Sequence, residues 1–123
     1  MKLGHVYIIE TVLTKPPKAK FAICVSVGDG FFVWINSRAR AEGHDQLPIA
    51  AGCHSLIRHE SHIDLSRIVC HQPYELANAQ EFEMISRDLR DAIVNKIGDG
   101  LMLLPPVHSR LIAENLRSLY QTV

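Results

Sequence analysis

The chain has 123 residues, which suits a single domain over 1–123 that buries a hydrophobic core of its own. Hydrophobic residues make up 47% and charged residues 21%, a composition that excludes intrinsic disorder as the main state. No apolar run approaches the roughly 20 residues of a membrane-spanning helix, and the first residues lack the apolar stretch of a signal peptide. We therefore expect a cytoplasmic protein with no membrane partner. Lys plus Arg equals Asp plus Glu, at 13 each, so net charge supplies no general attraction to nucleic acid.

The first third of the chain predicts three strands. Residues 5–10, 21–27 and 31–36 are rich in β-branched and aromatic side chains. Gly-Asp-Gly at 28–30 predicts a tight turn, so the second and third strands should form a hairpin. Thr-Lys-Pro-Pro-Lys at 14–18 predicts an exposed basic loop, because tandem prolines do not fit inside a central strand.

The next segments are shorter and more broken. Residues 37–46 are polar and predict a loop, and 47–51 predict a short strand with a proline near its start. A turn is expected at 52–54 and a brief strand at 56–57. Residues 63–69 begin with apolar and polar side chains in alternation, which predicts a further strand.

The last third predicts helices. Residues 72–82 contain a proline and are polar, so we expect a connection with a short helical turn at 75–79. Ser86 has the side chain of an N-cap, and the glycines Gly98 and Gly100 should end the helix that it starts. Pro105 and Pro106 should open a second helix. The expected apolar faces are Leu89, Ile93, Val94 and Ile97 in the first helix, and Val107, Leu111, Ile112, Leu116, Leu119 and Tyr120 in the second.

The order of elements predicts an α+β fold with strands in 4–71 and two helices in 85–121. A series of short strands within some 70 residues favours a small, curved antiparallel β-barrel whose opening the helices cover. The alternative is an open antiparallel sheet with the helices packed on one face.

The strand-rich part carries a basic cluster that could act on RNA. RNA cleavage by transesterification needs a base, an acid and a cation that stabilises the charged phosphorus centre, and histidine, lysine and arginine supply these without a metal. The residues with this chemistry are Lys18, Lys20, Arg38, Arg40, His44, Arg58, His59, Ser61 and His62. The competing interpretation is a solvated basic face. Phe31, Phe32 and Trp34 could stack on bases, although core packing is the more common reason for aromatic residues on a strand.

Cysteine and histidine residues gather between 53 and 71. The odd number of cysteines, at positions 24, 53 and 70, argues against a disulfide framework. Zinc binds such side chains, so a small zinc-binding protein is a further alternative, on Cys53, His54, His59, His62, Cys70 and His71. The segment has no Cys-x-x-Cys spacing, and we expect no cofactor.

Three stretches together resemble the PemK/MazF-type toxins of toxin–antitoxin modules. The first is Lys18-Ala-Lys-Phe-Ala-Ile-Cys-Val-Ser26, which is similar to the Lys-x-Arg-Pro segment that leads into an apolar strand in that family. The second is His59-Glu-Ser-His-Ile-Asp-Leu-Ser-Arg-Ile68, similar to the family's Ser-containing strand. The third is the ending over 85–116, a helix, a glycine-containing break and a final helix.

The resemblance implies an SH3-like barrel, usually dimeric, that cleaves single-stranded RNA without a metal and is inhibited by an antitoxin protein. It implies phosphate binding by Lys20, with Lys18 in the position of the family's lysine and Ser61 in that of the strand serine or threonine. His59 or His62 would then be the acid or base, with Arg38, Arg40 and Arg58 as RNA-binding cations. Lys20 stands where the family has arginine and Phe21 where it has proline, which motivates the alternative of a non-catalytic binding module.

Overall fold

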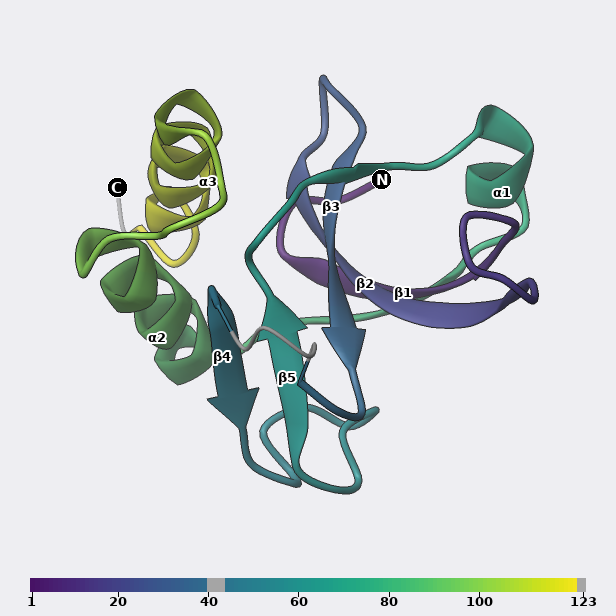
Figure 1. Ribbon diagram of the computed structural model, residues 1–123, viewed down its shortest axis with the longest axis horizontal. Helices are drawn as coiled ribbons and strands as arrows, with labels where there is room; N and C mark the ends of the chain where they lie inside the picture. Colours follow the sequence, from purple (N-terminus) through teal and green to yellow (C-terminus); the bar gives the residue numbers. More distant parts are fainter. Residues whose placement is uncertain (40–43, 122–123) are drawn as a thin grey trace.

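The computed structural model describes residues 1–39 and 44–121. Over these residues the chain forms one antiparallel sheet of seven strands, together with three helices (Figure 1). The strands are β1 (His5–Thr11), β2 (Lys18–Ser26), β3 (Phe31–Asn36), β4 (Gln46–Ile49), β5 (Ser61–Asp64), β6 (Val69–Cys70) and β7 (Gln80–Met84). The helices are α1 (Pro73–Ala77), α2 (Arg87–Gly98) and α3 (Pro106–Arg117).

The first three strands form a meander, which includes the expected hairpin of β2 and β3. β2 pairs with β1 on one side and with β3 on the other, and the turn between β2 and β3 closes through the Gly30 amide, 3.3 Å from the Val27 carbonyl. Gly30 has φ +66°, a conformation that favours glycine. β2 begins three residues earlier than predicted, and Lys18 and Lys20 therefore belong to the strand, opposite Thr11 and Ile9 of β1.

β3 is the shared strand at the centre of the sheet. It pairs with β5 near its C-terminal end and with β6 near its N-terminal end. The single strand predicted for 63–69 is wrong, because Asp64 ends β5: its carboxylate accepts hydrogen bonds from both the amide and the hydroxyl of Ser66. The brief strand predicted at 56–57 is also wrong, since Ile57 bonds locally to the carbonyl of His54 in a turn.

The segment predicted as a connection contains both a helix and a strand. The short helical turn expected at 75–79 is present as α1, which starts and ends two residues earlier. β7 then pairs with β1 at the end of the sheet. Two of its five residues, Glu81 and Glu83, are exposed acids, so its composition resembles a polar linker while its partner strand holds it extended.

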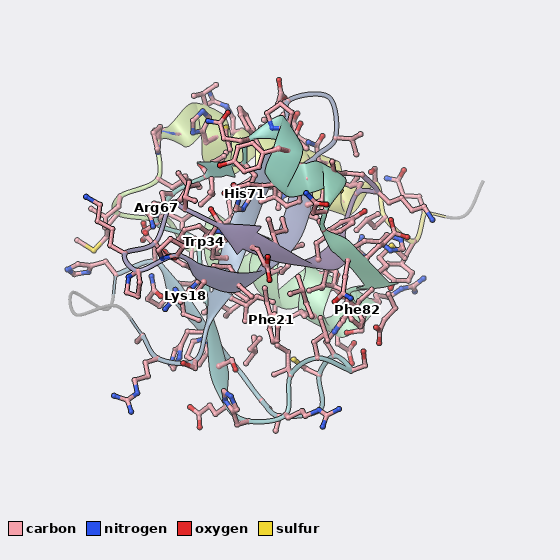
Figure 2. The ribbon with its side chains drawn as sticks, turned by 90° about the vertical axis from the view of Figure 1, so that its right-hand side faces the viewer. Lys18, Phe21, Trp34, Arg67, His71 and Phe82 are labelled. Atoms are coloured by element: carbon pink, nitrogen blue, oxygen red, sulfur yellow. The ribbon has the colours of Figure 1, made fainter. Side chains whose placement is uncertain are left out.

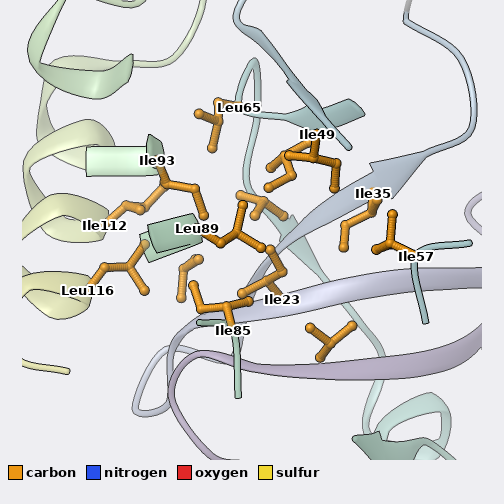
Figure 3. Close-up of a cluster of buried hydrophobic side chains, with 14 of the residues drawn as sticks. Ile23, Ile35, Ile49, Ile57, Leu65, Ile85, Leu89, Ile93, Ile112 and Leu116 are labelled. Carbon is orange, nitrogen blue, oxygen red and sulfur yellow. The ribbon is translucent and has the colours of Figure 1, made fainter. Parts of the chain in front are cut away.

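The two long helices pack together against one face of the sheet. Ser86 caps α2 as predicted, its hydroxyl accepting from the Leu89 amide at 3.1 Å, and Pro106 is the first residue of α3. Buried side chains of α2 and α3 point towards Ile23 and Ile49 of the strands in Figure 3. The predicted stripe of α3 is confirmed at its buried positions Ile112 and Leu116, whereas Val107, in the first turn, is 61% exposed.

The opposite face of the sheet has a smaller hydrophobic cluster, formed by Tyr7, Ile9, Ala22, Cys24, Phe32, Trp34 and Val69. Leu76 and Ala79, from α1 and the residues after it, pack against this cluster. Figure 1 shows α1 at the end of the molecule away from α2 and α3.

The antiparallel α+β class is confirmed, and the closed barrel is not. In the described part of the chain the strand order is β4-β5-β3-β2-β1-β7, with β6 also on β3, and β4 and β7 do not pair with each other. Across the same residues, each helix falls short of the length and hydrophobicity that a membrane crossing requires.

Candidate functional site

Two adjoining hollows lie where β2 begins and β3 ends. The first, of about 190 Å³, has Ser61 in its lining and is called the Ser61 hollow. The second, of about 390 Å³, has Arg67 in its lining and is called the Arg67 hollow. Both are lined by Lys18, Lys20, Asn36 and Ser37. The two hollows are neighbours at these four residues and are together called the basic trough here.

The Ser61 hollow brings together residues from three separate segments. Lys18 and Lys20 come from β2, Ser61 begins β5, and Arg58 and His59 come from the turn before β5. The Ser61 hydroxyl donates to the His59 carbonyl at 3.0 Å and lies 3.5 Å from His59 Nδ1. Of the predicted catalytic residues, Lys20, His59 and Ser61 therefore share one hollow, with Lys18 and Arg58 beside them.

The Arg67 hollow holds more cations around a tryptophan. Lys20 Nζ lies 4.9 Å from the centroid of the Trp34 ring, and Arg67 Cζ lies 5.0 Å from it. Lys20 also donates a hydrogen bond to Asn36 Oδ1. Lys18, Trp34 and Arg67 gather on the same side of the sheet in Figure 2, and Arg38 and Asp64 line the hollow with them.

The environment of Lys20 disfavours its charge. Burial is the main cause that lowers the pKa of Lys20, and the neighbouring cations Lys18 and Arg67 lower it further, while the Asp64 carboxylate opposes the shift. A bound anion would relieve this repulsion, because an opposite charge favours the protonated amine. The Thr14 hydroxyl in the same hollow is buried and has no hydrogen-bond partner within 1–39 and 44–121. The trough is thus suited to a negatively charged ligand.

A buried chain of hydrogen bonds, from Trp34 to His71 and Glu75, holds the Trp34 side chain in place. Its Nε1–H donates to His71 Nε2 at 3.1 Å, and His71 Nδ1 lies 2.9 Å from Glu75 Oε1. Because Nε2 accepts from the indole, we assign the proton of the neutral ring to Nδ1, which donates to Glu75. The Glu75 carboxylate also accepts from the Thr11 hydroxyl at 3.1 Å and from the Val12 amide at 2.9 Å.

The pKa of Glu75 reflects this network. Burial acts to raise the pKa of Glu75, but the hydrogen bonds from His71, from the Val12 amide and from Thr11 outweigh it, and the pKa lies below its ordinary value.

Trp34 itself is only 4% exposed, and its ring is covered by Lys20 and Arg67. Trp34 and the fully buried Phe32 are therefore core residues, and Trp34 positions cations instead of stacking on a base.

The remaining predicted residues lie elsewhere or are not described. His62 lines neither hollow. It follows Ser61 on β5, and because adjacent strand residues face opposite ways, it faces away from the Ser61 hollow. Its Nδ1 atom is buried and has no hydrogen-bond partner within the described ranges. Arg38 is exposed and lines the Arg67 hollow. Arg40 lies outside the residues that the structure describes.

The zinc alternative lacks a cluster of ligands. Within residues 1–39 and 44–121, no group of three histidine, cysteine or acidic side chains could hold a metal ion. Both ring nitrogens of His71 are engaged by Trp34 and Glu75, and those of His54 by the Leu56 amide and the Glu83 carbonyl. Burial also raises the pKa of the Cys53 thiol, which disfavours the thiolate that zinc requires.

Sequence reasoning missed Asn36 and Arg67 as parts of the site, and it considered Trp34 only as a residue that could stack on a base or pack in the core. A signal was present for two of them, because strand alternation places Trp34 and Asn36 on one face of β3. Arg67 carried no such signal, since it lies in the break between β5 and β6 that the predicted single strand concealed.

Comparison with known proteins gives no match: no protein-family model, no curated protein and no solved structure matches the chain.

Proposed function

We propose that the chain binds single-stranded RNA in the basic trough and cleaves it as a metal-independent endoribonuclease related to the PemK/MazF toxins. The observation that carries the proposal is that Lys20, His59 and Ser61 line one hollow, and that Lys20 also lines a second hollow with Arg38 and Arg67. A chain of phosphates needs such a series of cations, and aligned cations supply most of the affinity for nucleic acid.

The residues of the Ser61 hollow support a transesterification. In the proposed step the 2′-oxygen of RNA attacks the adjacent phosphorus as its proton passes to His59. The bond from phosphorus to the 5′-oxygen breaks, and Lys20 gives a proton to that leaving oxygen; its lowered pKa eases the transfer. The products are a 2′,3′-cyclic phosphate and a 5′-hydroxyl. Arg58 stabilises the extra negative charge on the phosphate oxygens, and the Ser61 hydroxyl does so once it turns from the His59 carbonyl.

Several finer features belong to the same proposal. The sharing of β3 between β5 and β6 supports a strongly curved sheet of the SH3-like kind. A homodimer and an antitoxin partner rest on the family resemblance alone, and a cytoplasmic location is the expectation drawn from the sequence.

The second candidate is a non-catalytic module that binds RNA without cutting it. It is favoured by Lys20, which replaces the family's arginine and already bonds to Asn36 and packs on Trp34. A single ammonium group cannot grip two phosphate oxygens as a guanidinium does.

The test is incubation of the purified protein with a single-stranded oligoribonucleotide in the presence of a chelator. We expect cleavage with 2′,3′-cyclic phosphate ends, and a loss of about a hundredfold or more in rate for His59→Ala and Ser61→Ala. His62→Ala is the matched control and should retain the rate, because His62 lines neither hollow. Binding without cleavage would establish the second candidate, and no binding at low salt would overturn both.

A further inference from the structure

A third hollow adjoins the basic trough. It has a volume of about 440 Å³ and lies between the end of β1, the start of β2 and helix α1. It is called the Tyr74 hollow here. Lys18 lines this hollow as well as the Ser61 and Arg67 hollows. A phosphate held at Lys18 would therefore have the Tyr74 hollow beside it.

The lining of the Tyr74 hollow differs in charge from the trough. Its charged residues within the described chain are Lys18 and the two acids Glu10 and Glu75. Glu75 lines the hollow without serving as an acceptor for a ligand, since both of its oxygens already accept hydrogen bonds from Thr11, Val12 and His71. Glu10 is exposed and its carboxylate faces solvent as an acceptor. Carboxylates repel phosphate, so this hollow suits an uncharged part of a ligand.

Its walls also offer an aromatic ring at the surface. Tyr74 is 57% exposed at the start of α1, and the neighbouring Val12 is 56% exposed. Asn78 donates its Nδ2–H to the Tyr74 carbonyl at 2.9 Å, which fixes the amide and leaves its side-chain oxygen as an acceptor. An exposed ring beside hydrogen-bond acceptors is an arrangement by which proteins bind unpaired bases.

We propose that the Tyr74 hollow binds the base of a nucleotide next to the phosphate held in the basic trough. Tyr74 is the stacking surface, and Glu10 and Asn78 accept hydrogen bonds from the edge of the base. Acceptors select bases with an exocyclic amino group, so cytosine, adenine or guanine is preferred to uracil. The inference rests on the proposed function and adds base selection to phosphate binding.

The experiment measures the affinity of the wild type, Tyr74→Ala and Tyr74→Phe for oligo(C), for oligo(U) and for an abasic oligoribonucleotide of the same length. Binding is measured with Ser61→Ala as the background, so that the RNA stays intact. Tyr74→Ala should weaken oligo(C) binding by between about fivefold and about a hundredfold and leave abasic binding unchanged, whereas Tyr74→Phe should retain the affinity. Glu10→Gln should reduce the preference for oligo(C) over oligo(U).

The outcomes separate the two levels of the proposal. If the protein with an unchanged Tyr74 binds the intact and the abasic oligomer with equal affinity, the base site is overturned. This comparison needs no Tyr74 variant. Equal weakening of both oligomers by Tyr74→Ala also overturns it, because the residue would then act on the backbone or the fold. Failure of every oligomer to bind both the Ser61→Ala protein and the unaltered protein overturns the proposed function itself.

Discussion

Lys20 carries a positive charge in a half-buried position on β2, close to the cations of Lys18 and Arg67. Its lowered pKa means that the folded state disfavours the protonated amine relative to the unfolded chain. Below the folded-state pKa, the protonated amine of Lys20 lowers the free energy of unfolding by its full amount. The cost disappears as the pH rises through that pKa towards the ordinary value of 10.5, because the unfolded chain then binds more protons than the folded one.

Lys20→Met should therefore separate stability from RNA binding. At neutral pH we expect a higher free energy of unfolding than in the wild type, because the methionine keeps the contact with Trp34 without the buried charge. The gain should shrink between neutral pH and pH values near 10, and RNA affinity should fall. Urea unfolding at several pH values measures the first effect. Lys18→Met is the matched control, since Lys18 is exposed and its loss should leave stability within about 0.5 kcal/mol.

The chemistry of single residues could be predicted further than their placement. The types of Lys18, Lys20, His59 and Ser61 were enough to identify candidates for RNA cleavage, and the structure brings these four together. The sequence could not choose between His59 and His62, because the choice depends on which face of β5 lines the hollow.

At the scale of elements, the local signals that end and begin helices were reliable. Ser86 satisfies the Leu89 amide at the start of α2, and Pro106 begins α3 where its missing N–H costs little. β7 and the split between β5 and β6 could not be predicted in the same way. β7 depends on β1, which lies far away in sequence, and β6 on the distant end of β3.

Ser86→Ala should remove the N-cap and destabilise the domain by about 1 kcal/mol. The Leu89 amide would lose its 3.1 Å acceptor at a helix end that packs on the core. Chemical denaturation measures the change. Ser86→Asp should retain most of the stability, because its carboxylate accepts the same hydrogen bond and favours the positive end of the helix. An unchanged midpoint for Ser86→Ala would show that the cap contributes nothing.

At the scale of the whole molecule, the two faces of the sheet have different cores. The α2 and α3 face is held by aliphatic side chains, whereas the α1 face depends on the polar chain from Trp34 through His71 and Glu75 to Thr11. The amphipathic pattern predicted the first core. The polar chain of the second core was hidden, because Thr11, Trp34 and Glu75 lie on three different elements and His71 lies between β6 and α1.

His71→Phe should destabilise the molecule by at least about 2 kcal/mol, because it leaves the buried Trp34 Nε1–H without its acceptor and removes a donor from Glu75. It should also weaken RNA binding, since Trp34 supports Lys20 and Arg67. Thermal unfolding and RNA titration measure the two effects. His71→Gln, which keeps a donor and an acceptor, should lose less of both, and equal losses for the two variants would argue against the hydrogen-bonded chain.

The position of Trp34 has a practical consequence. It is the single tryptophan of the chain, and two cations lie about 5 Å from its ring. Indole emission responds to the electric field of nearby charges, so a ligand that draws Lys20 or Arg67 away from the ring alters the native fluorescence. Binding of a ligand in the Arg67 hollow can thus be followed in the unlabelled protein by the intrinsic fluorescence of Trp34.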